Sequence, residues 1–232
     1  MNFGIKSAVL IIALMLVGCS AAKQARDVKA SGFLKGHYNK LQKGKEGEVI
    51  YIYKNPKTDF KSYRKILLDP ILMWRSVDSD LSRISKEDLK KLANFFYTAM
   101  YKNLSKDYEM VQRPQTATLR VQIALTSVEE SSVIMEVAST IVPAAILFSQ
   151  GKELFTGKPT AVGEASLEAK ITDAMTGELL AAGISRRYGG KQLDGFTDSW
   201  EDVKSILQYW ADKLAWRFCM HREETNCKPP QE

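Results

Sequence analysis

The sequence predicts an α+β fold, with a mostly antiparallel sheet of about five or six strands and two long helices packed on one face of the sheet. Three observations lead to this prediction. Several segments alternate apolar and polar residues with period two, and two other segments repeat apolar residues at helical spacing. Apolar residues make up 45% of the 232-residue chain, enough for a folded core. Because both helical stripes need an apolar surface to cover, the sheet is expected to lie beneath them.

Three segments are predicted as strands outside any hairpin. Residues 48–53 are β-branched and aromatic, and Asn55-Pro56 follows them. Residues 63–70 contain an apolar run that ends at a proline. Residues 119–125 alternate most cleanly, so this strand is expected to place every second side chain in the core. Residues 108–111 are a further, short candidate strand.

A β-hairpin is predicted near the end of the chain. Residues 165–172 alternate, and residues 179–188 return as a second strand. Between them lie Asp173, Thr176 and Gly177, residue types that turns require.

Two helices complete the predicted fold. Ser85 is the expected N-cap of the first, with Asp88 three residues later. Its apolar face consists of Leu89, Leu92, Ala93, Phe96, Met100 and Leu104. The second helix is expected to begin near Ser199, and its face consists of Trp200, Val203, Leu207, Trp210, Leu214 and Phe218.

The start of the chain resembles the leader of a bacterial lipoprotein. Lys6 supplies a positive charge, residues 8–17 are apolar, and Leu16-Val17-Gly18-Cys19 is similar to a lipobox. The resemblance implies attachment of diacylglycerol to the Cys19 thiol, cleavage between Gly18 and Cys19, and often acylation of the new amine, with palmitate as an example of the acyl chain. A transmembrane anchor would need about 20 apolar residues, more than this run offers. Ser20 in place of an aspartate implies sorting to the outer membrane.

These features divide the chain into four parts. Residues 1–18 are the predicted signal peptide, 19–30 a tether, 31–222 a single α+β domain and 223–232 a polar tail. After lipidation of Cys19, Cys219 and Cys227 remain as a pair, and export to an oxidising compartment predicts a disulfide between them. Two free thiols, or a weak metal site that includes His221, are the alternatives.

The sequence contains no recognisable catalytic or cofactor motif. We expect no catalytic residue, metal or cofactor, and therefore no enzyme. Asp69, Glu168 and Asp173 are acids that could act in principle, although turn and strand roles explain them. Arg186 and Arg187 are interpreted as a solvated strand end, with an anionic head-group site as the alternative. The net charge of +6 is scattered, which argues against nucleic acid as a partner.

Residues 133–148 are almost uncharged and contain Pro143. They are interpreted as a buried helix followed by a turn. A surface that dips into lipid or binds a partner is the alternative.

Four stretches of the mature chain are similar to a family of bacterial envelope lipoproteins known only as domain of unknown function number thirty-three thirteen. They are residues 31–41, the strand at 63–70, the hairpin around Asp173 and Gly177, and the final helix with Trp200 and Trp210-Ala211. The resemblance implies a location and a fold, and brings no reaction with it.

The expected function is therefore that of a non-catalytic periplasmic lipoprotein, anchored by its lipid to the outer membrane and binding a protein or another envelope component. Two alternatives stay open. One is a cell-envelope hydrolase, which requires paired acids or an activated nucleophile in a pocket. The other is a carrier for an apolar ligand, which requires an apolar cavity of several hundred Å³.

Overall fold

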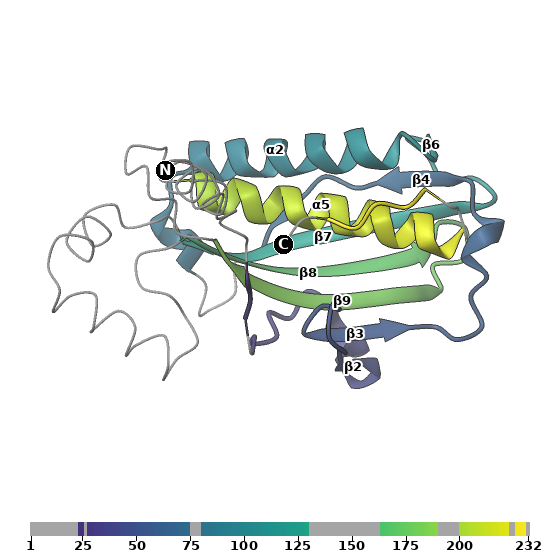
Figure 1. The fold of residues 1–232 in the computed structure, drawn as a ribbon, viewed down its shortest axis with the longest axis horizontal. Coiled ribbons are helices and arrows are strands. Elements are labelled where there is room, and N and C mark those ends of the chain that lie inside the picture. The colour runs from purple at the N-terminus through teal and green to yellow at the C-terminus, as the bar shows by residue number, and fades with distance from the viewer. Residues whose placement is uncertain are drawn as a thin grey trace, which may run out of the picture.

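One mixed sheet of nine strands runs through the residues that the computed structural model describes (Figure 1). Those residues are 23–25, 27–74, 80–129, 163–189, 200–222 and 226–230. The strand order is β2-β3-β9-β8-β7-β4-β6, with β1 beside β9 and β5 beside β7. The residues predicted as a buried helix, 133–148, lie outside the described part of the chain.

The longest strands form the middle of the sheet. They are β7 (Thr118–Glu129), β8 (Glu164–Asp173) and β9 (Leu179–Tyr188), and each is antiparallel to the next. The β8–β9 hairpin confirms the prediction from the alternating pattern. In its turn, the Asp173 carboxylate accepts hydrogen bonds from the backbone of Met175 and Thr176, and Gly177 has a φ of +73°. That left-handed conformation is readily adopted only by glycine.

The predicted α+β fold with five or six mostly antiparallel strands is wrong in strand number and in the pairing of one half of the sheet. Strand β4 (Lys65–Leu68) runs parallel to β7 and to β6 (Glu109–Met110), and β5 (Leu72–Met73) is also parallel to β7. The physical reason is the connection. Between β4 and β6, helix α2 carries the chain back along the sheet. The next strand therefore starts from the same end of the sheet as β4 and runs parallel to it.

On the other half of the sheet, β3 (Tyr51–Lys54) is antiparallel to β9 and to β2 (Gln42–Lys43). Strand β1 (Lys23–Gln24) pairs with the far end of β9, at Arg187 and Tyr188. Two-residue strands such as β1, β2 and β5 are too short to show an alternating pattern, which is why the predicted sheet was too small. Strand β6 lies within the short strand predicted at 108–111.

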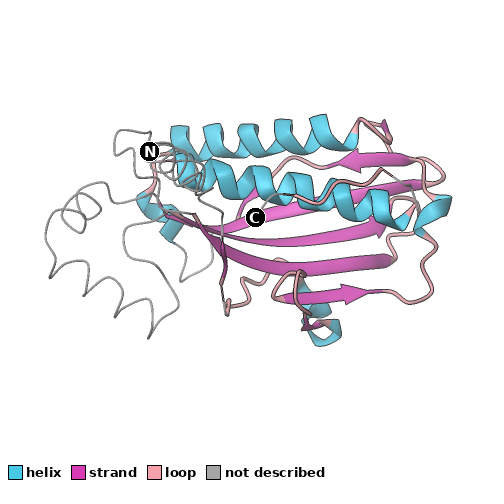
Figure 2. Ribbon diagram, in the orientation of Figure 1, coloured by secondary structure: helices cyan, strands magenta, loops and turns pink. Residues whose placement is uncertain are grey.

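Helices α2 (Lys86–Leu104) and α5 (Glu201–His221) lie next to each other on the same side of the sheet (Figure 1, Figure 2). The predicted N-cap of α2 is confirmed, because the Ser85 side chain accepts a hydrogen bond from the Asp88 backbone at 3.0 Å. Phe96 of α2 and Trp210 of α5 pack against each other with ring centroids 6.3 Å apart. Together with Ile66, Leu119 and Leu125 of the sheet they belong to the main core.

The opposite face of the sheet carries a smaller core. Phe33 and Leu34 pack there against Ala124, Ala182 and Ile184. The described residues form short 3-10 helices at η2 (Lys35–Lys40), η3 (Phe60–Ser62) and η4 (Asp80–Arg83). Both faces of the central strands are therefore covered, which explains why β7 and β8 are buried along most of their length.

Candidate functional site

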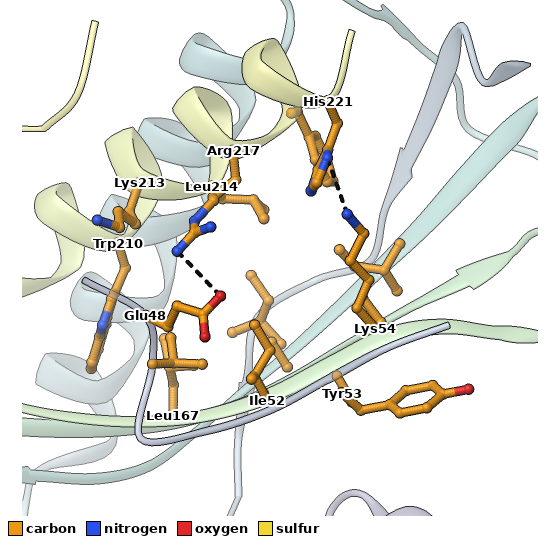
Figure 3. Close-up of a pocket in the computed structure, with 18 of the residues that line it drawn as sticks. Glu48, Ile52, Tyr53, Lys54, Leu167, Trp210, Lys213, Leu214, Arg217 and His221 are labelled. Carbon is orange, nitrogen blue, oxygen red and sulfur yellow. Dashed lines mark hydrogen bonds and ion pairs between the residues drawn. The ribbon is translucent and has the colours of Figure 1, made fainter. Parts of the chain in front are cut away.

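A cleft of about 590 Å³ lies between helix α5 and the half of the sheet formed by β3, β9 and β8 (Figure 3). This volume is in the range of small-molecule sites. Its inner end is closed by Phe96 and Met100 of α2, which belong to the main core. The cleft therefore reaches from the surface into the apolar interior.

Small side chains on the sheet make room for the cleft. Ala169 of β8, Ala181 of β9 and Gly183 of β9 all line it. A Cβ on Gly183 would lie 3.0 Å from the Val49 side chain, so the strand and the segment before β3 meet too closely for a larger residue. Because larger residues at these positions would fill the space beneath α5, their small size creates the cavity.

Strand β3 supplies one wall through its alternation. Ile52 and Lys54 face the cleft, whereas the ring of Tyr53 points away from it in Figure 3. Successive side chains of a strand point to opposite faces, so an apolar and a charged residue both reach the cavity from this edge.

Helix α5 supplies the opposite wall with two parallel rows of side chains. Residues four apart lie on the same face of a helix. Trp210, Leu214 and Phe218 form the apolar row that lines the cleft. The neighbouring row, which also lines it, is basic and consists of Lys213, Arg217 and His221. An apolar interior thus ends at a basic rim.

The rim carries a net positive charge. The charged lining residues are Lys40, Lys54, Lys213, Arg217 and Glu48, a formal sum of +3 with His221 neutral. The Lys40 ammonium lies over the Tyr53 ring and the Lys213 ammonium over the Trp216 ring, so Lys54 and Arg217 are the cations at the opening itself. Arg217 pairs with Glu48 at 3.8 Å, from the helix to the segment before β3. In Figure 3 these two side chains point toward each other across the opening.

His221 lies at the end of this rim. Its Nδ1 atom is 3.3 Å from the Lys54 ammonium, and its ring stacks on Phe60 with centroids 5.1 Å apart. Burial lowers the pKa of His221 below the usual 6.5, and the positive charges of Lys54 and Arg217 lower it further. The imidazole is therefore neutral at pH 7 and accepts a hydrogen bond from Lys54.

The C-terminal cysteines lie beside the same end of α5. Cys219 and Cys227 form a disulfide, with Cα atoms 5.7 Å apart. Among the described residues, no group of three or more metal-ligating side chains gathers around His221 or elsewhere.

The three acids that the sequence singled out each have their own structural partners. Asp69 accepts hydrogen bonds from Arg120 and Gln122, the closest at 2.7 Å. Asp173 holds the hairpin turn and accepts a hydrogen bond from the Tyr63 hydroxyl at 3.0 Å. None of the three lines the cleft.

Glu168 is the deepest of these acids, with 0% exposure. Its carboxylate accepts hydrogen bonds from the backbone amides of Ser31 and Leu34 and, at 2.6 Å, from the Tyr38 hydroxyl. The acid therefore fixes the segment that covers the second face of the sheet.

The interpretation of Arg186 and Arg187 as a solvated strand end is wrong for the second residue. Arg187 is 3% exposed, and its guanidinium lies 3.8 Å from the centre of the Tyr209 ring on α5. Arg186 pairs with the buried carboxylate of Glu164. Both arginines join β9 to its neighbours, and neither lines the cleft.

The cleft and its rim were not predicted from the sequence. Trp210, Leu214 and Phe218 were expected to lie entirely in the core, and no role was predicted for Lys54, Lys213 or Arg217. One signal was present in the sequence: basic residues at 213, 217 and 221 repeat every four positions directly beside the apolar row. Such a row beside a core-facing stripe marks the edge of the buried surface of a helix.

Gly18 and Cys19, the predicted cleavage and lipidation sites, lie outside the described residues. Within the part of the chain that the structure describes, no helix is long and apolar enough to cross a membrane.

The fold and the cleft define a class of protein with one mixed sheet, helices on one face and an apolar cavity beneath the last helix. The chain belongs to the family described as protein of unknown function (DUF3313), whose model matches residues 29–214. This confirms the resemblance drawn from the sequence. No curated protein matches the chain.

Two solved structures are similar to the chain at low identity. The PelC dodecamer from Paraburkholderia phytofirmans is 7% identical with a TM-score of 0.37, and the match covers 68% of this chain and 89% of that one. A putative neuraminyllactose-binding hemagglutinin homolog from Helicobacter pylori is 11% identical with a TM-score of 0.35, covering 81% and 92%. At these scores neither likeness bears on what this chain does.

Proposed function

We propose that this protein is a non-catalytic lipoprotein of the bacterial envelope that binds an envelope component in the cleft beneath α5. The cleft carries the proposal, because an apolar cavity of about 590 Å³ with polar groups only at its rim is the usual form of a small-molecule binding site. The hydrolase alternative gains no support, since the acids discussed above are engaged in structural hydrogen bonds away from the cleft.

The membrane attachment in this proposal rests on the leader and on Cys19. A diacylglycerol group on the Cys19 sulfur, with or without a third acyl chain on the new amino terminus, would anchor the mature protein stably, and Ser20 favours the periplasmic face of the outer membrane. Strand β1 begins at Lys23, only four residues after Cys19. Four residues reach about 14 Å at most, so the sheet, and with it the cleft, would be held close to the lipid surface.

A carrier for an apolar ligand is the second candidate function, and the same cleft favours it. A carrier differs from a fixed receptor in that it releases its ligand to a second membrane. Transfer of a fluorescent acyl lipid between two vesicle populations would distinguish the two, since a receptor retains the lipid and a carrier accelerates its exchange.

The test is to isolate the protein from the envelope of its native host. We expect the wild-type protein to fractionate with outer membrane, to have the intact mass of the acylated chain that starts at Cys19, and to carry a stoichiometric small molecule into organic extracts. Cys19→Ala should lose the membrane fraction. A Cys19→Ala protein that still sediments with outer membrane, or extracts that contain no bound molecule, would count against the proposal.

A further inference from the structure

We infer that the cleft takes a lipid with a single acyl chain and an anionic phosphate head group, of the kind that a membrane yields when a phospholipid loses one chain. This inference rests on the proposed function, because it names the ligand class of the same cleft.

The apolar part of the cleft fits one chain. Its walls are Trp210, Leu214 and Phe218 on one side and Ile52 and Leu167 on the other, with the small residues of β8 and β9 at its base. The cleft lies between one helix and one sheet, and its volume of about 590 Å³ is in the lower half of the range for small-molecule sites, roughly 300–1,000 Å³. On this volume the inference assigns one acyl chain to the cleft and leaves a second chain in water.

The rim selects the head group. Lys54 approaches the opening from β3 and Arg217 approaches it from α5, so one cation faces the mouth from each wall (Figure 3). An anionic head group at this mouth would neutralise part of the net +3 charge while its chain stays in the apolar slot. A phosphate has more acceptor oxygens than a carboxylate, and arginine and lysine side chains are its usual protein partners.

The geometry around Arg217 gives the head group a place to bind. Arg217 is 3.8 Å from Glu48, which is the long end of the range for an ion pair. Lys54 faces His221, a neutral partner at 3.3 Å. Neither cation is fully neutralised by its protein partner, so both gain from a phosphate placed between them.

The experiment measures binding to the purified mature chain at pH 8 and below micelle concentrations, by calorimetry. The probes are dodecyl phosphate, decyl phosphate and dodecyl maltoside, whose sugar head is neutral. We expect dodecyl phosphate to bind at least about tenfold more tightly than dodecyl maltoside. It should bind roughly fifteenfold more tightly than decyl phosphate, because the two extra methylenes each contribute about fourfold when buried.

Variants separate the head group from the chain. The double variant Lys54→Gln with Arg217→Gln should bind dodecyl phosphate about a hundredfold more weakly than the wild type and bind dodecyl maltoside with nearly unchanged affinity. Lys90→Gln, on the exposed side of α2 and outside the cleft, is the matched control and should change neither. Leu214→Trp fills the slot and should abolish both, with Ile52→Trp as a second filling variant where thermal unfolding shows that the first does not fold.

The outcomes distinguish the two proposals. If both dodecyl probes bind equally and the filling variants block both, the cleft binds apolar ligands but the anionic inference is wrong. If no probe binds and the envelope extracts are also empty, the proposed function fails as well. Recovery of a diacyl lipid or a free fatty acid as the stoichiometric ligand would contradict the inference of a single-chain phosphate lipid and leave the proposed binding function standing.

Discussion

The Lys54 ammonium on β3 lies 3.3 Å from Nδ1 of His221 at the end of α5, a contact between residues 167 positions apart in the chain. The two elements do not pair with each other, and the cleft opens between them. The contact therefore links the two walls of the cleft at its basic rim. A change in the charge of either partner should change the affinity of the cleft for a charged ligand.

The first prediction concerns the pH dependence of ligand binding. Because burial, Lys54 and Arg217 hold the pKa of His221 below 6.5, the imidazole gains its charge only at a pH below its ordinary titration range. As the pH falls through that pKa, the rim gains one positive charge, and an anionic amphiphile should bind several-fold more tightly. Calorimetry with decanesulfonate between pH 8 and pH 5 measures this, since the charge of a sulfonate stays constant in that range.

His221→Gln provides the control, because glutamine is polar and does not titrate. The variant should bind decanesulfonate with an affinity that varies little over the same pH range. An unchanged pH dependence in His221→Gln would assign the effect to another group. The stability of the free protein should change in the opposite direction to its ligand affinity. Because folding lowers the pKa of His221, the unfolded chain binds the proton more readily, and the free energy of unfolding should fall as the pH drops below 6.5.

The second prediction concerns Glu168, the fully buried acid of β8. Glu168→Gln places an amide among the donors Ser31, Leu34 and Tyr38, so one acceptor oxygen is lost and two donors face each other. An unsatisfied buried polar group costs roughly 1–3 kcal/mol, and we expect a loss of about 2 kcal/mol in the free energy of unfolding. Urea denaturation of the mature chain measures it.

Glu109→Gln is the matched control for this substitution, because the Glu109 side chain is 64% exposed and should change stability by less than about 0.5 kcal/mol. Tyr38→Phe removes the hydrogen bond that the hydroxyl donates to Glu168 and also the acceptor of the Gly32 amide, and should cost roughly 1–2 kcal/mol. Equal stability of Glu168→Gln and Glu109→Gln would show that the carboxylate does not hold the covering segment.

How far the sequence predicts this fold depends on the length of each pattern. The β8–β9 hairpin and helix α2 are long enough to repeat their apolar pattern several times, so the sequence predicts whether each is strand or helix. Ser85 marks the start of the helix and Gly177 marks the turn of the hairpin. Strand β5, with Leu72 and Met73, has two residues and therefore no period. The parallel pairing of β4 follows from the way α2 crosses the sheet. That crossing is a matter of tertiary packing, and the alternating pattern of a strand does not predict it.

The cleft could not be predicted from the sequence for a similar reason, because it depends on which strands lie next to each other. Alanines at 169 and 181 are ordinary strand residues on their own, and they become a cavity only when adjacent strands place them beneath α5. Lys54 and His221 are neighbours through the fold alone. The sequence could indicate a basic row on α5, but only the register of β3 with β9 brings the second wall of cations opposite to it.

The third prediction tests the start of α2. Ser85→Ala removes the side chain that accepts a hydrogen bond from the Asp88 backbone at 3.0 Å. Loss of such a cap costs about 1 kcal/mol, and thermal and urea unfolding should both show it. Ser105→Ala at the other end of the same helix is the comparison, because the exposed Ser105 hydroxyl bonds only weakly to the Lys102 carbonyl at 3.3 Å. An equal effect of the two substitutions would contradict a capping role for Ser85.

The fourth prediction concerns the pair Cys219 and Cys227, which closes a short loop at the end of α5. A disulfide over a sequence separation of 8 restricts the unfolded chain by roughly 2–3 kcal/mol in the chain-entropy model, so Cys219→Ser with Cys227→Ser should lower the free energy of unfolding by about that amount. Because His221 follows Cys219 by two residues, fraying of the last turn should also separate His221 from Lys54 and weaken binding of an anionic amphiphile. Urea unfolding with and without reductant measures the first effect, and calorimetry with dodecyl phosphate measures the second. Reductant should leave the double serine variant unchanged, and a wild-type protein whose stability is indifferent to reductant would show that the bond does not hold the helix end.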